Sequence, residues 1–593
     1  MINLPPAFIY IIGALLIPLI RGRRLQQAVA LLIPVIAMAT LLQMPQGVYW
    51  QVQFLDYELI LGRVDRLSLL FAYIFVIISF ISMIYAIHIK EMGQHVAAYL
   101  YVGSTLGVVF AGDLFSLFFF WEIMAAASVF LIWYNKTPTS LMAGFRYAMV
   151  HLFGGAILLG GIVMQVSSTG SIAFNPFDLS TLAAKFILFG FLINAAVPPL
   201  HAWLPDAYPE GTITGSVFMT AFTTKSAVYV LARSFAGTEL LVWLGAIMAV
   251  YGVIYAIIEK DIRRLLSYHI VSQVGYMVCA VGLGSEMALN GAGAHAFCHI
   301  IYKAVLFMGM GAVIQVTGRR NILDLKGRNL YRQMPITLVL YMVGAFSISA
   351  VPLFNGFVSK TMIVAAAGYG HRPVIELMLH LASVGTFLSV GLKLPWGVWF
   401  GKADGSEDEI ANVKEPPLNM QIGMGLGALL CVITGIFPQT LYKLLPYEVH
   451  FHPYTPSHVV ASLQLLLLTL AGFCLYIDKL MAGKKSISLD TDWFYRIFGW
   501  TVLLFCRYPL NRFRNLVQLA FADKIQIAAR LSKHPYALLE IVWYAIIGQE
   551  KSMTELLQRP YNEKDYRVPI GIGVCASLIF LFLYALIYMR VAG

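Results

Sequence analysis

Long apolar segments recur throughout this chain, and they determine the solvent in which it can fold. Residues 114–134, LFSLFFFWEIMAAASVFLIWY, contain a single charged side chain in a run of membrane-spanning length. A transmembrane helix needs about 20 mostly apolar residues, and it satisfies its backbone polar groups within itself. Charged residues make up 12% of the chain, against about 25% in soluble domains. We therefore predict an all-α polytopic membrane protein.

The chain divides at its loops and at changes in composition. About fourteen runs of span length precede residue 480, by the length that a helix needs to cross the bilayer. The predicted parts are a three-helix segment at 1–90 with an external loop at 44–65, two larger blocks at 96–260 and 262–437, a further span at 458–480, an amphipathic extension at 487–565 and a C-terminal transmembrane anchor at 568–590.

The extension differs from the spans in its charge. Residues 511–534, NRFRNLVQLAFADKIQIAARLSKH, place apolar side chains at helical spacing among several basic ones. Burying those basic groups in a bilayer would cost several kcal/mol. We therefore expect an amphipathic lateral helix at about 510–550 that lies along the membrane plane, at the cytoplasmic face, and contacts a neighbouring subunit.

Basic residues concentrate in alternate loops, whereas the intervening loops contain few. This positive-inside pattern places the N-terminus outside and predicts a multi-pass protein of an inner or cytoplasmic membrane. It also accounts for the net charge of +11 without a nucleic-acid partner. The richer loops contain Arg21, Arg23 and Arg24; Lys90; Lys136; Lys260, Arg263 and Arg264; Arg319, Arg320, Lys326, Arg328 and Arg332; Lys402 and Lys414; and Lys479, Lys484 and Lys485.

The sequence carries no motif of a cofactor site. Its six cysteines lie in or beside apolar runs and form no CxxC pair, so we expect no disulfide, zinc site or iron–sulfur cluster. No glycine-rich phosphate loop of the GxxxxGKS or GxGxxG kind follows a strand, which argues against nucleotide hydrolysis by this chain. We expect no bound cofactor or metal, and membership of a larger redox enzyme stays open.

Seven ionisable residues lie inside the apolar runs, and they are the best indicators of function. An ionised group at the bilayer centre costs roughly 2.5–3.5 kcal/mol. A single such residue could reach the interface along its own stem, but seven of mixed chemistry predict a hydrated relay for protons or ions. They are Glu122, Lys225, His295, His299, Lys303, Lys360 and Lys393.

Three of these residues share one helical face. His295, His299 and Lys303 follow each other at intervals of four. Histidine titrates near neutrality, which suits a proton relay. Two alternatives remain: buried structural histidines, or two ligands of a metal whose third ligand the sequence does not reveal.

The other candidates depend on partners from distant segments. Glu122 has no neutralising neighbour in sequence, so we expect an ion pair or one bridging water to a basic side chain of another helix, with Arg146 favoured. Small hydroxyl residues flank Lys225 and allow close helix approach. For Glu122 and Lys225 the alternative is a purely structural role. For Lys360 and Lys393 the alternative is a position near a helix end, from which the side chain reaches the membrane interface. Secondary polar candidates are His151, Asn194, His269 and Gln273.

A short internal repeat marks two corresponding spans. FLINAAVPPLHAW at 191–203 and FLSVGLKLPWGVW at 387–399 align Pro199 with Pro395. Proline removes a helix hydrogen bond, so we expect helix breaks at Pro198, Pro199 and Pro395. Broken helices at equivalent positions of two halves point to a transport site, with chance similarity of two aromatic-rich spans as the alternative.

Five segments together resemble one family, the proton-translocating antiporter-like subunits of respiratory complex I, of multisubunit Mrp-type cation/proton antiporters and of membrane-bound hydrogenases. They are FFFWEIM, PPLHAWLPDAYPEGTITGSVF, KDIRRLLSYHIVSQVGYM, HAFCHIIYKAVLFMGMGAV and GFVSK, spread over roughly residues 65–440. The D-type antiporter subunit is the most similar. This resemblance implies two inverted five-helix repeats, at 96–260 and 262–437, each with one broken helix.

The resemblance also implies roles for individual residues. Glu122 corresponds to the family's buried glutamate, and Lys225 to the lysine that bridges two half-channels. The face of His295, His299 and Lys303 corresponds to the central axis, and Lys393 to the charged residue of the second broken helix, near the exit. The family's usual lysine before the first broken-helix proline is replaced by Asn194, for which Arg146 is a possible substitute.

Three functions remain compatible with the sequence. The leading one is a proton-translocating subunit that works with other membrane subunits and moves protons, with Na⁺ as an additional candidate ion. The others are an autonomous secondary transporter of a small solute, and a structural membrane subunit with an incomplete proton channel, for which Asn194 is the best argument. Copurification separates them, because an autonomous carrier purifies alone.

Overall fold

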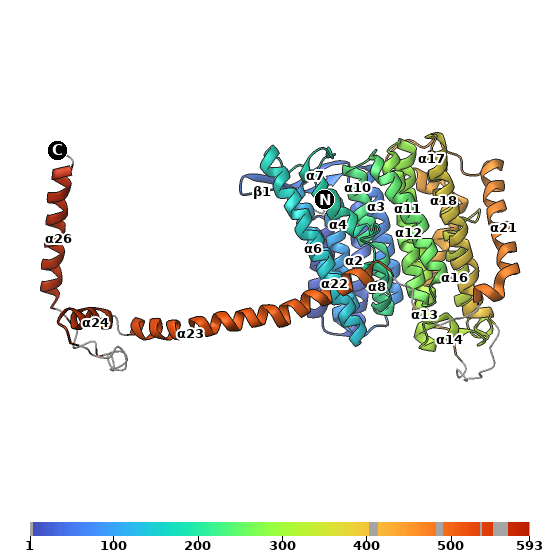
Figure 1. Cartoon of the computed structure of the whole chain (residues 1–593). Coiled ribbons are helices and arrows are strands. Elements are labelled where there is room, and N and C mark those ends of the chain that lie inside the picture. Colours follow the sequence, from blue (N-terminus) through green and yellow to red (C-terminus); the bar gives the residue numbers. More distant parts are fainter. Residues whose placement is uncertain are drawn as a thin grey trace. The chain divides into compact units, whose positions relative to one another are not determined.

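The computed structural model describes residues 4–401, 413–481, 490–533, 536–549, 562, 567 and 569–591 (Figure 1). The chain forms two compact units, Met1–Asp492 and Trp493–Gly593. The chain is an all-α polytopic membrane protein apart from one β-hairpin in its described part. The finer domain boundaries predicted within the first unit stay predictions.

The N-terminal segment contains the three predicted helices, α1 (Pro6–Leu16), α2 (Arg23–Leu42) and α3 (Arg66–Ala86). The segment expected to be a loop is instead an antiparallel hairpin of β1 (Gly47–Phe54) and β2 (Tyr57–Val64), in register from Gly47–Val64 to Phe54–Tyr57. The exposed, alternating β-branched and aromatic residues of this segment favour a hairpin over irregular chain.

The rest of the first unit is helical. Its elements are α4 (Met92–Phe110), α5 (Leu114–Trp133), α6 (Pro138–Thr169), α7 (Leu182–Asn194), α8 (Trp203–Ala207), α9 (Ile213–Ala221), α10 (Thr223–Ser234), α11 (Glu239–Ile258), α12 (Ile262–Leu283), α13 (Glu286–Thr317), α14 (Ile322–Leu325), α15 (Leu330–Gln333), α16 (Pro335–Ile348), α17 (Asn355–Tyr369), α18 (Pro373–Thr386), the π-helical η3 (Phe387–Lys393) and η4 (Trp396–Phe400), α19 (Leu418–Ile436), α20 (Gln439–Tyr442) and α21 (Pro456–Met481).

Ten described helices are long and apolar enough to cross a membrane, and four shorter apolar ones accompany them. The predicted total of about fourteen core spans therefore stays a prediction, as does the inverted relation of the two blocks. The long central helix α13 packs against α3, α9, α12, α16, α17 and α19. It is buried along nearly its whole length, which removes its polar face from both lipid and bulk water.

Helices α11 and α12 approach each other unusually closely. A Cβ added to Gly275 of α12 would lie 2.5 Å from the backbone nitrogen of Ala249 on α11. Glycine therefore brings the two backbones into contact, as small residues do between helices in membranes. This contact fixes α12, which carries His269 and Gln273, beside the centre of the bundle.

The two predicted proline breaks differ. Between α7 and α8 the helix is interrupted from Ala195 to Ala202, as Pro198 and Pro199 predict. At Pro395 the expected break is wrong, because the chain stays helical and widens into π-helical turns on either side. A π-bulge accommodates the missing N–H without ending the helix. The sequence patterns correspond, but the two local structures are not the same.

Two further interruptions occur where the sequence shows no proline pair. Phe222 separates α9 from α10, three residues before Lys225. Residues 349–354 separate α16 from α17, six residues before Lys360. Each interruption ends a run of helix hydrogen bonds and exposes backbone carbonyls inside the bundle.

The second unit contains α22 (Asp492–Phe505), the π-helical η5 (Cys506–Leu510), α23 (Asn511–Lys533), α24 (Ala537–Ile546) and α26 (Ile570–Val591). The expected single helix at about 510–550 is therefore at least two helices, and helical structure begins earlier, at Asp492. Phe513, Leu516 and Leu519 of α23 are exposed, as are Arg512 and Arg514, and the amphipathic character of this helix stays a prediction. The predicted location along the membrane plane stays a prediction.

Candidate functional site

The face of α13 lies at the centre of the buried polar residues. His295, His299 and Lys303 are completely buried, and the two imidazole centroids are 6.2 Å apart. His295 Nδ1 lies 2.9 Å from Ser359 Oγ of α17. Both nitrogens of His299 and the Nζ atom of Lys303 have no hydrogen-bond partner among the described residues. Buried groups of this kind normally bind ordered water, so this face is suited to a hydrated relay.

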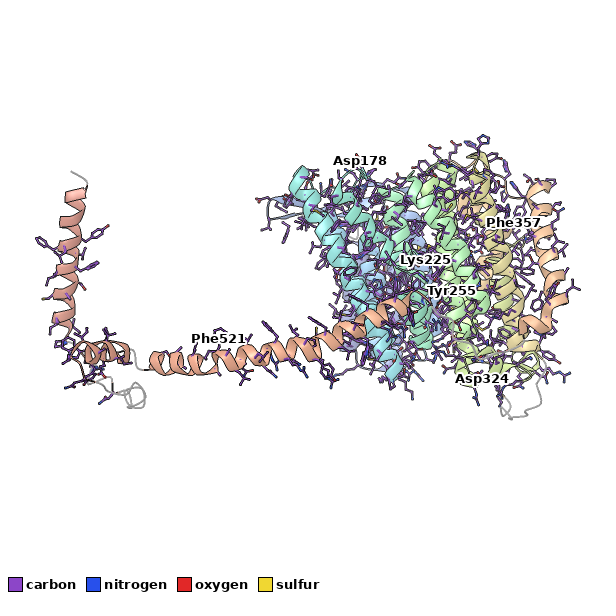
Figure 2. The ribbon with its side chains drawn as sticks, in the orientation of Figure 1. Asp178, Lys225, Tyr255, Asp324, Phe357 and Phe521 are labelled. Atoms are coloured by element: carbon purple, nitrogen blue, oxygen red, sulfur yellow. The ribbon has the colours of Figure 1, made fainter. Side chains whose placement is uncertain are left out.

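Lys225 lies inside the bundle, at the start of α10 (Figure 2). Its Nζ atom donates to the carbonyl oxygen of Thr220, at 2.5 Å, and to Thr224 Oγ1, at 3.1 Å. The interruption at Phe222 makes the Thr220 carbonyl available, because α9 ends before an intrahelical donor can reach it. A backbone break thus solvates a buried ammonium without any carboxylate partner.

Electrostatic interactions link Lys225 to the α13 face. Lys225, His299, Lys303 and Lys360 are all at most 2% exposed, and charges act strongly on one another in such a poorly screening interior. These groups carry like charge when protonated. A proton on one of them therefore raises the energy of a proton on the next, which favours passing charge along the series.

Side chains of α12 connect the α13 face to η3. Tyr302 Oη lies 3.4 Å from His295 Nε2 and donates to Gln273 Oε1 at 3.3 Å. One turn before Gln273, His269 Nε2 lies 2.6 Å from Ser389 Oγ. The predicted members His269 and Gln273 therefore belong to the same polar group as α13.

The two remaining lysines bind helix ends. Lys360 Nζ donates to the carbonyl oxygen of Ile348 at 2.7 Å and lies 4.9 Å from the ring centre of Tyr276. Lys393 Nζ donates to the carbonyl oxygens of Ile257 and Glu259, at 2.6 and 2.7 Å. Lys393 is therefore at the end of α11, beside residues 259–261, which join α11 to α12. The role near an exit that the resemblance implies stays a prediction.

Among the described contacts Glu122 and Arg146 form no direct ion pair, and the alternative of one bridging water stays a prediction. Arg146 forms a bidentate ion pair with Asp206 of α8, with contacts of 2.7 and 2.9 Å. Glu122 Oε1 is buried and has no hydrogen-bond partner among the described residues. A planar guanidinium prefers a carboxylate that it can contact with two parallel hydrogen bonds, and Asp206 offers that geometry at the helix break.

Asn194 instead has a histidine partner. His151 Nδ1 of α6 lies 2.9 Å from Asn194 Oδ1 at the end of α7. The His151 ring is 4.2 Å from the ring of Tyr147, whose hydroxyl bonds Ser128 Oγ at 2.9 Å. An imidazole thus lies directly against Asn194, the position for which the resemblance implies a lysine.

The Glu122 carboxyl group of α5 lies against α6, one turn beyond His151 of that helix. A Cβ added at Gly155, one turn after His151, would collide with Glu122 Oε1. Gly155 therefore leaves the space that the Glu122 carboxyl group occupies. The first block contributes a carboxylate, an imidazole and an amide to one buried region, although none of them is adjacent in sequence.

We expect Gly155→Ala to lower proton movement severalfold while the helices stay assembled. The new methyl group displaces the end of a flexible side chain and not backbone, so the cost to the fold is small. Proton flux into vesicles and the yield of assembled complex would measure the two effects. Gly160→Ala on the same helix is the control, because its Cβ would meet only Phe186, at 3.9 Å. Equal flux in both variants would contradict a functional position for Glu122.

The structure also reveals a cluster that sequence analysis missed. Asp490 is buried and accepts hydrogen bonds from Tyr251 Oη at 2.5 Å, Tyr268 Oη at 2.6 Å and His201 Nε2 at 3.2 Å. Burial raises the pKa of the Asp490 carboxyl group, but the hydrogen bonds from His201, Tyr251 and Tyr268 outweigh it and hold this pKa well below its ordinary value of 3.8. Asp490 lies outside the apolar runs, so no buried-charge criterion could have found it.

Comparison with known proteins gives one family and several relatives. Residues 111–389 match the family described as NADH:quinone oxidoreductase/Mrp antiporter, transmembrane. The A/B component of a probable K⁺/H⁺ antiporter of Rhizobium meliloti is 31% identical over 413 residues, which cover 65% of this chain and 41% of that protein. The A-type component of the Na⁺/H⁺ antiporter of Alkalihalophilus pseudofirmus is 30% identical over 427 residues, covering 64% and 52%.

The chain therefore spans only about half the length of these two curated relatives. The D-type component of the same Alkalihalophilus pseudofirmus antiporter is 28% identical over 358 residues, covering 57% of this chain and 71% of that protein. The A-type and D-type antiporter proteins are thus similarly related to this chain. A chain of the Mrp complex from Dietzia sp. DQ12-45-1b has the same fold, with a TM-score of 0.67 at 22% identity, over 79% of this chain and 98% of that one.

Proposed function

We propose a function from the premise that this chain belongs, through residues 111–389, to the NADH:quinone oxidoreductase/Mrp antiporter transmembrane family. The chain is a membrane subunit of a multisubunit complex, and it moves protons through its buried polar residues, alone or in exchange for a cation such as Na⁺. One observation carries this proposal: Lys225, His295, His299 and Lys303 are completely buried among apolar helices, and the nitrogens of His299 and Lys303 have no hydrogen-bond partner among the described residues.

Proton transfer along the series needs no cofactor. A proton that reaches Lys225 Nζ converts the amine to an ammonium, which the Thr220 carbonyl and the Thr224 hydroxyl solvate. Its charge acts on His299, and water between the two can accept the proton and pass it to the imidazole. His295, Tyr302 and Gln273 then continue the path toward α12 and η3. Each transfer breaks one N–H or O–H bond and forms another.

The first block supplies the charge that biases this transfer. Glu122 and His151 lie beside α6 and α7, and hydroxyl groups lead from them toward Lys225. Tyr147 contacts His151, and Tyr101 Oη lies 2.6 Å from Thr223 Oγ1, two residues before Lys225. The replacement of the usual lysine by Asn194 therefore removes one charge but leaves His151 as a titratable group. This argues against a structural subunit with an incomplete channel.

The exposed apolar surface favours a subunit over an autonomous carrier. Phe119 and Phe130 of α5 are 61% and 48% exposed, and Glu122 lies between them with its helix face only partly covered. The Glu122 carboxyl group itself is turned inward, with Oε1 buried against Gly155. The exposed aromatic side chains beside it form an apolar surface that a neighbouring subunit would cover. The distribution of basic residues among the loops supports a separate part of the proposal, an N-terminus on the outer side of the cytoplasmic membrane.

Purification of the native complex and reconstitution into vesicles tests this function. The assembled complex should change the internal pH of the vesicles when a cation gradient or its redox substrate is supplied. Glu122→Gln should lower the rate by about tenfold or more, because it keeps the shape but cannot titrate. Glu58→Gln, an exposed carboxylate of β2, is the control. A chain that purifies alone and carries a small solute would exclude the proposal.

A further inference from the structure

An apolar cavity lies between α16, the π-helical η3 and η4, and α21, which Figure 1 shows at the edge of the first unit. Its volume is about 670 Å³, within the range of about 300–1,000 Å³ that is usual for ligand pockets. Trp396 of η4 and Phe473 of α21 both line it, with ring centroids 6.5 Å apart. Since η3 packs against both α16 and α21, the cavity is a space that these helices leave between them.

A hydrocarbon chain is the occupant that suits this lining. Aliphatic and aromatic side chains dominate it, and no described residue in it is charged. A buried water needs about two to four polar partners, and protein interiors leave few large voids empty. Val339 of α16 and Leu470 of α21 line the cavity and are 63% and 39% exposed. The cavity therefore opens at the side of the bundle, where an acyl chain of a bilayer lipid can enter.

One end of the cavity adjoins two basic side chains. Phe400 lines the cavity at the end of η4, and its ring stacks on Tyr331 of α15 with centroids 5.7 Å apart. The exposed Arg332 places its guanidinium carbon 5.4 Å from the Tyr331 ring centre, and its Nε atom donates to Tyr331 Oη at 2.9 Å. Lys326 lies against Gly401, the residue after Phe400. The apolar space thus ends beside a surface that can bind an anion.

The charge pattern predicts that this end is cytoplasmic. The cavity reaches the start of α16 at Leu338 and the last turns of α21 at Ile477. The helix ends found there adjoin the basic loops at 319–332, 402–414 and 479–485, which the positive-inside pattern places in the cytoplasm. Anionic lipid headgroups of the cytoplasmic leaflet attract basic side chains. A guanidinium can also bind a phosphate group through two parallel hydrogen bonds.

We propose that this cavity binds an anionic phospholipid of the cytoplasmic leaflet, with an acyl chain between α16, η3, η4 and α21 and the phosphate group on Arg332 and Lys326. Leu392 and Pro395 line the cavity on either side of Lys393 in the sequence. The acyl chain therefore packs against the π-helical segment that carries Lys393, a kind of segment often found at functional sites. This inference goes beyond the proposed function, because lipid binding is measured without proton movement.

Lipid photocrosslinking to the assembled complex tests the site. The native complex, stripped of lipid in detergent, would receive phosphatidylglycerol or phosphatidylcholine with the same diazirine-labelled acyl chain, and mass spectrometry would locate the adducts. At Phe473, which is 4% exposed and lines the cavity, phosphatidylglycerol should label at least about fivefold more than phosphatidylcholine, because it alone has a net negative charge. Leu468 of α21 is the control position, since it is 72% exposed and does not line the cavity. It should be labelled equally by both lipids.

Three variants separate the headgroup from the chain. Arg332→Gln should lower phosphatidylglycerol labelling at Phe473 severalfold, toward the level of phosphatidylcholine. Arg319→Gln removes the same charge from another exposed arginine of the loop and should leave this labelling unchanged. Val339→Trp fills the cavity from α16 and should remove labelling at Phe473 by both lipids, and Met342→Trp is a second variant of this kind.

The absence of adducts at Phe473 with either lipid would overturn the site. Equal labelling by the two lipids, or an equal loss in Arg319→Gln and Arg332→Gln, would show that no anionic headgroup is bound at Arg332 in particular. Phosphatidylglycerol should also slow hydrogen exchange at residues 391–396 severalfold, and unchanged exchange would contradict contact of the chain with the π-helical segment. Labelling as expected in a complex that moves no protons would exclude the proposed function and leave the lipid site intact.

Discussion

Lys225→Ala is expected to lower proton movement through the assembled complex by about a hundredfold or more, the effect of losing an essential proton-transfer group. Lys225 is the titratable group that joins the first block to the α13 face, and an alanine there cannot carry a proton. The substitution leaves the Thr220 carbonyl without its donor, at a cost of about 1–3 kcal/mol. That cost is small enough for a helix buried on all sides to persist.

Proton flux in vesicles, normalised to the amount of assembled complex, measures this effect. Lys185→Ala is the matched control, because Lys185 is an exposed lysine of α7. Lys225→Met separates charge from volume, since methionine fills a similar space without a titratable group. Wild-type flux in a correctly assembled Lys225→Ala complex would rule out a relay through Lys225.

The fold class could be predicted from the sequence because the bilayer leaves few choices. A run of apolar residues long enough to span must be a helix, and the runs around 114–134 and 262–283 are both helical. The hairpin at 47–64 was missed, because its two-residue connection, Leu55 and Asp56, contains neither the glycine nor the asparagine that usually marks a tight hairpin turn. Tertiary contacts decide such short elements.

The lysines and histidines of the second block were predictable for the same reason. A charged residue in an apolar run must be buried in a bundle, and His295, His299 and Lys303 are indeed completely buried. Their neighbours Ser359, Tyr302 and Ser389 were not predicted. Hydroxyl residues are inexpensive anywhere in a span, so their presence in a sequence does not indicate which of them face the polar series.

Pairing between distant segments could not be predicted. The sequence offers the carboxylates of both Glu122 and Asp206 as possible partners of Arg146. The packing of α6 against α8 brings Asp206 within hydrogen-bond distance. From the sequence, Asn194 indicated that a proton-transfer residue had been lost. In the structure, His151 of α6 lies beside Asn194 and supplies a titratable group there. Sequence spacing determines which face of a helix a residue occupies, but not what lies opposite.

Asp490→Ala is expected to release residues 490–492 from the helix break at α7–α8. The carboxylate holds Tyr251, Tyr268 and His201, and Thr491 Oγ1 donates to the Pro199 carbonyl at 3.2 Å. Removing one member of a buried, hydrogen-bonded charged cluster typically costs about 3–5 kcal/mol. The chain enters α22 at Asp492, so the segment that leads to the second unit would lose its attachment.

The same cluster gives a pH dependence whose sign is fixed by the carboxylate. Because the pKa of Asp490 is held below its ordinary value of 3.8 in the folded protein, its stabilisation is present above about pH 4 and is lost as the pH falls through the lowered folded-state pKa. The difference in stability between wild type and Asp490→Asn should therefore be constant from neutral pH down to about pH 5 and shrink below pH 4.

Thermal unfolding of the purified complex, with hydrogen exchange at residues 490–492, measures both effects. Asp56→Asn, in the exposed turn of the hairpin, is the control. Unchanged exchange at 490–492 in Asp490→Ala would mean that the carboxylate does not hold this segment, and a difference that grew toward acid would contradict the sign.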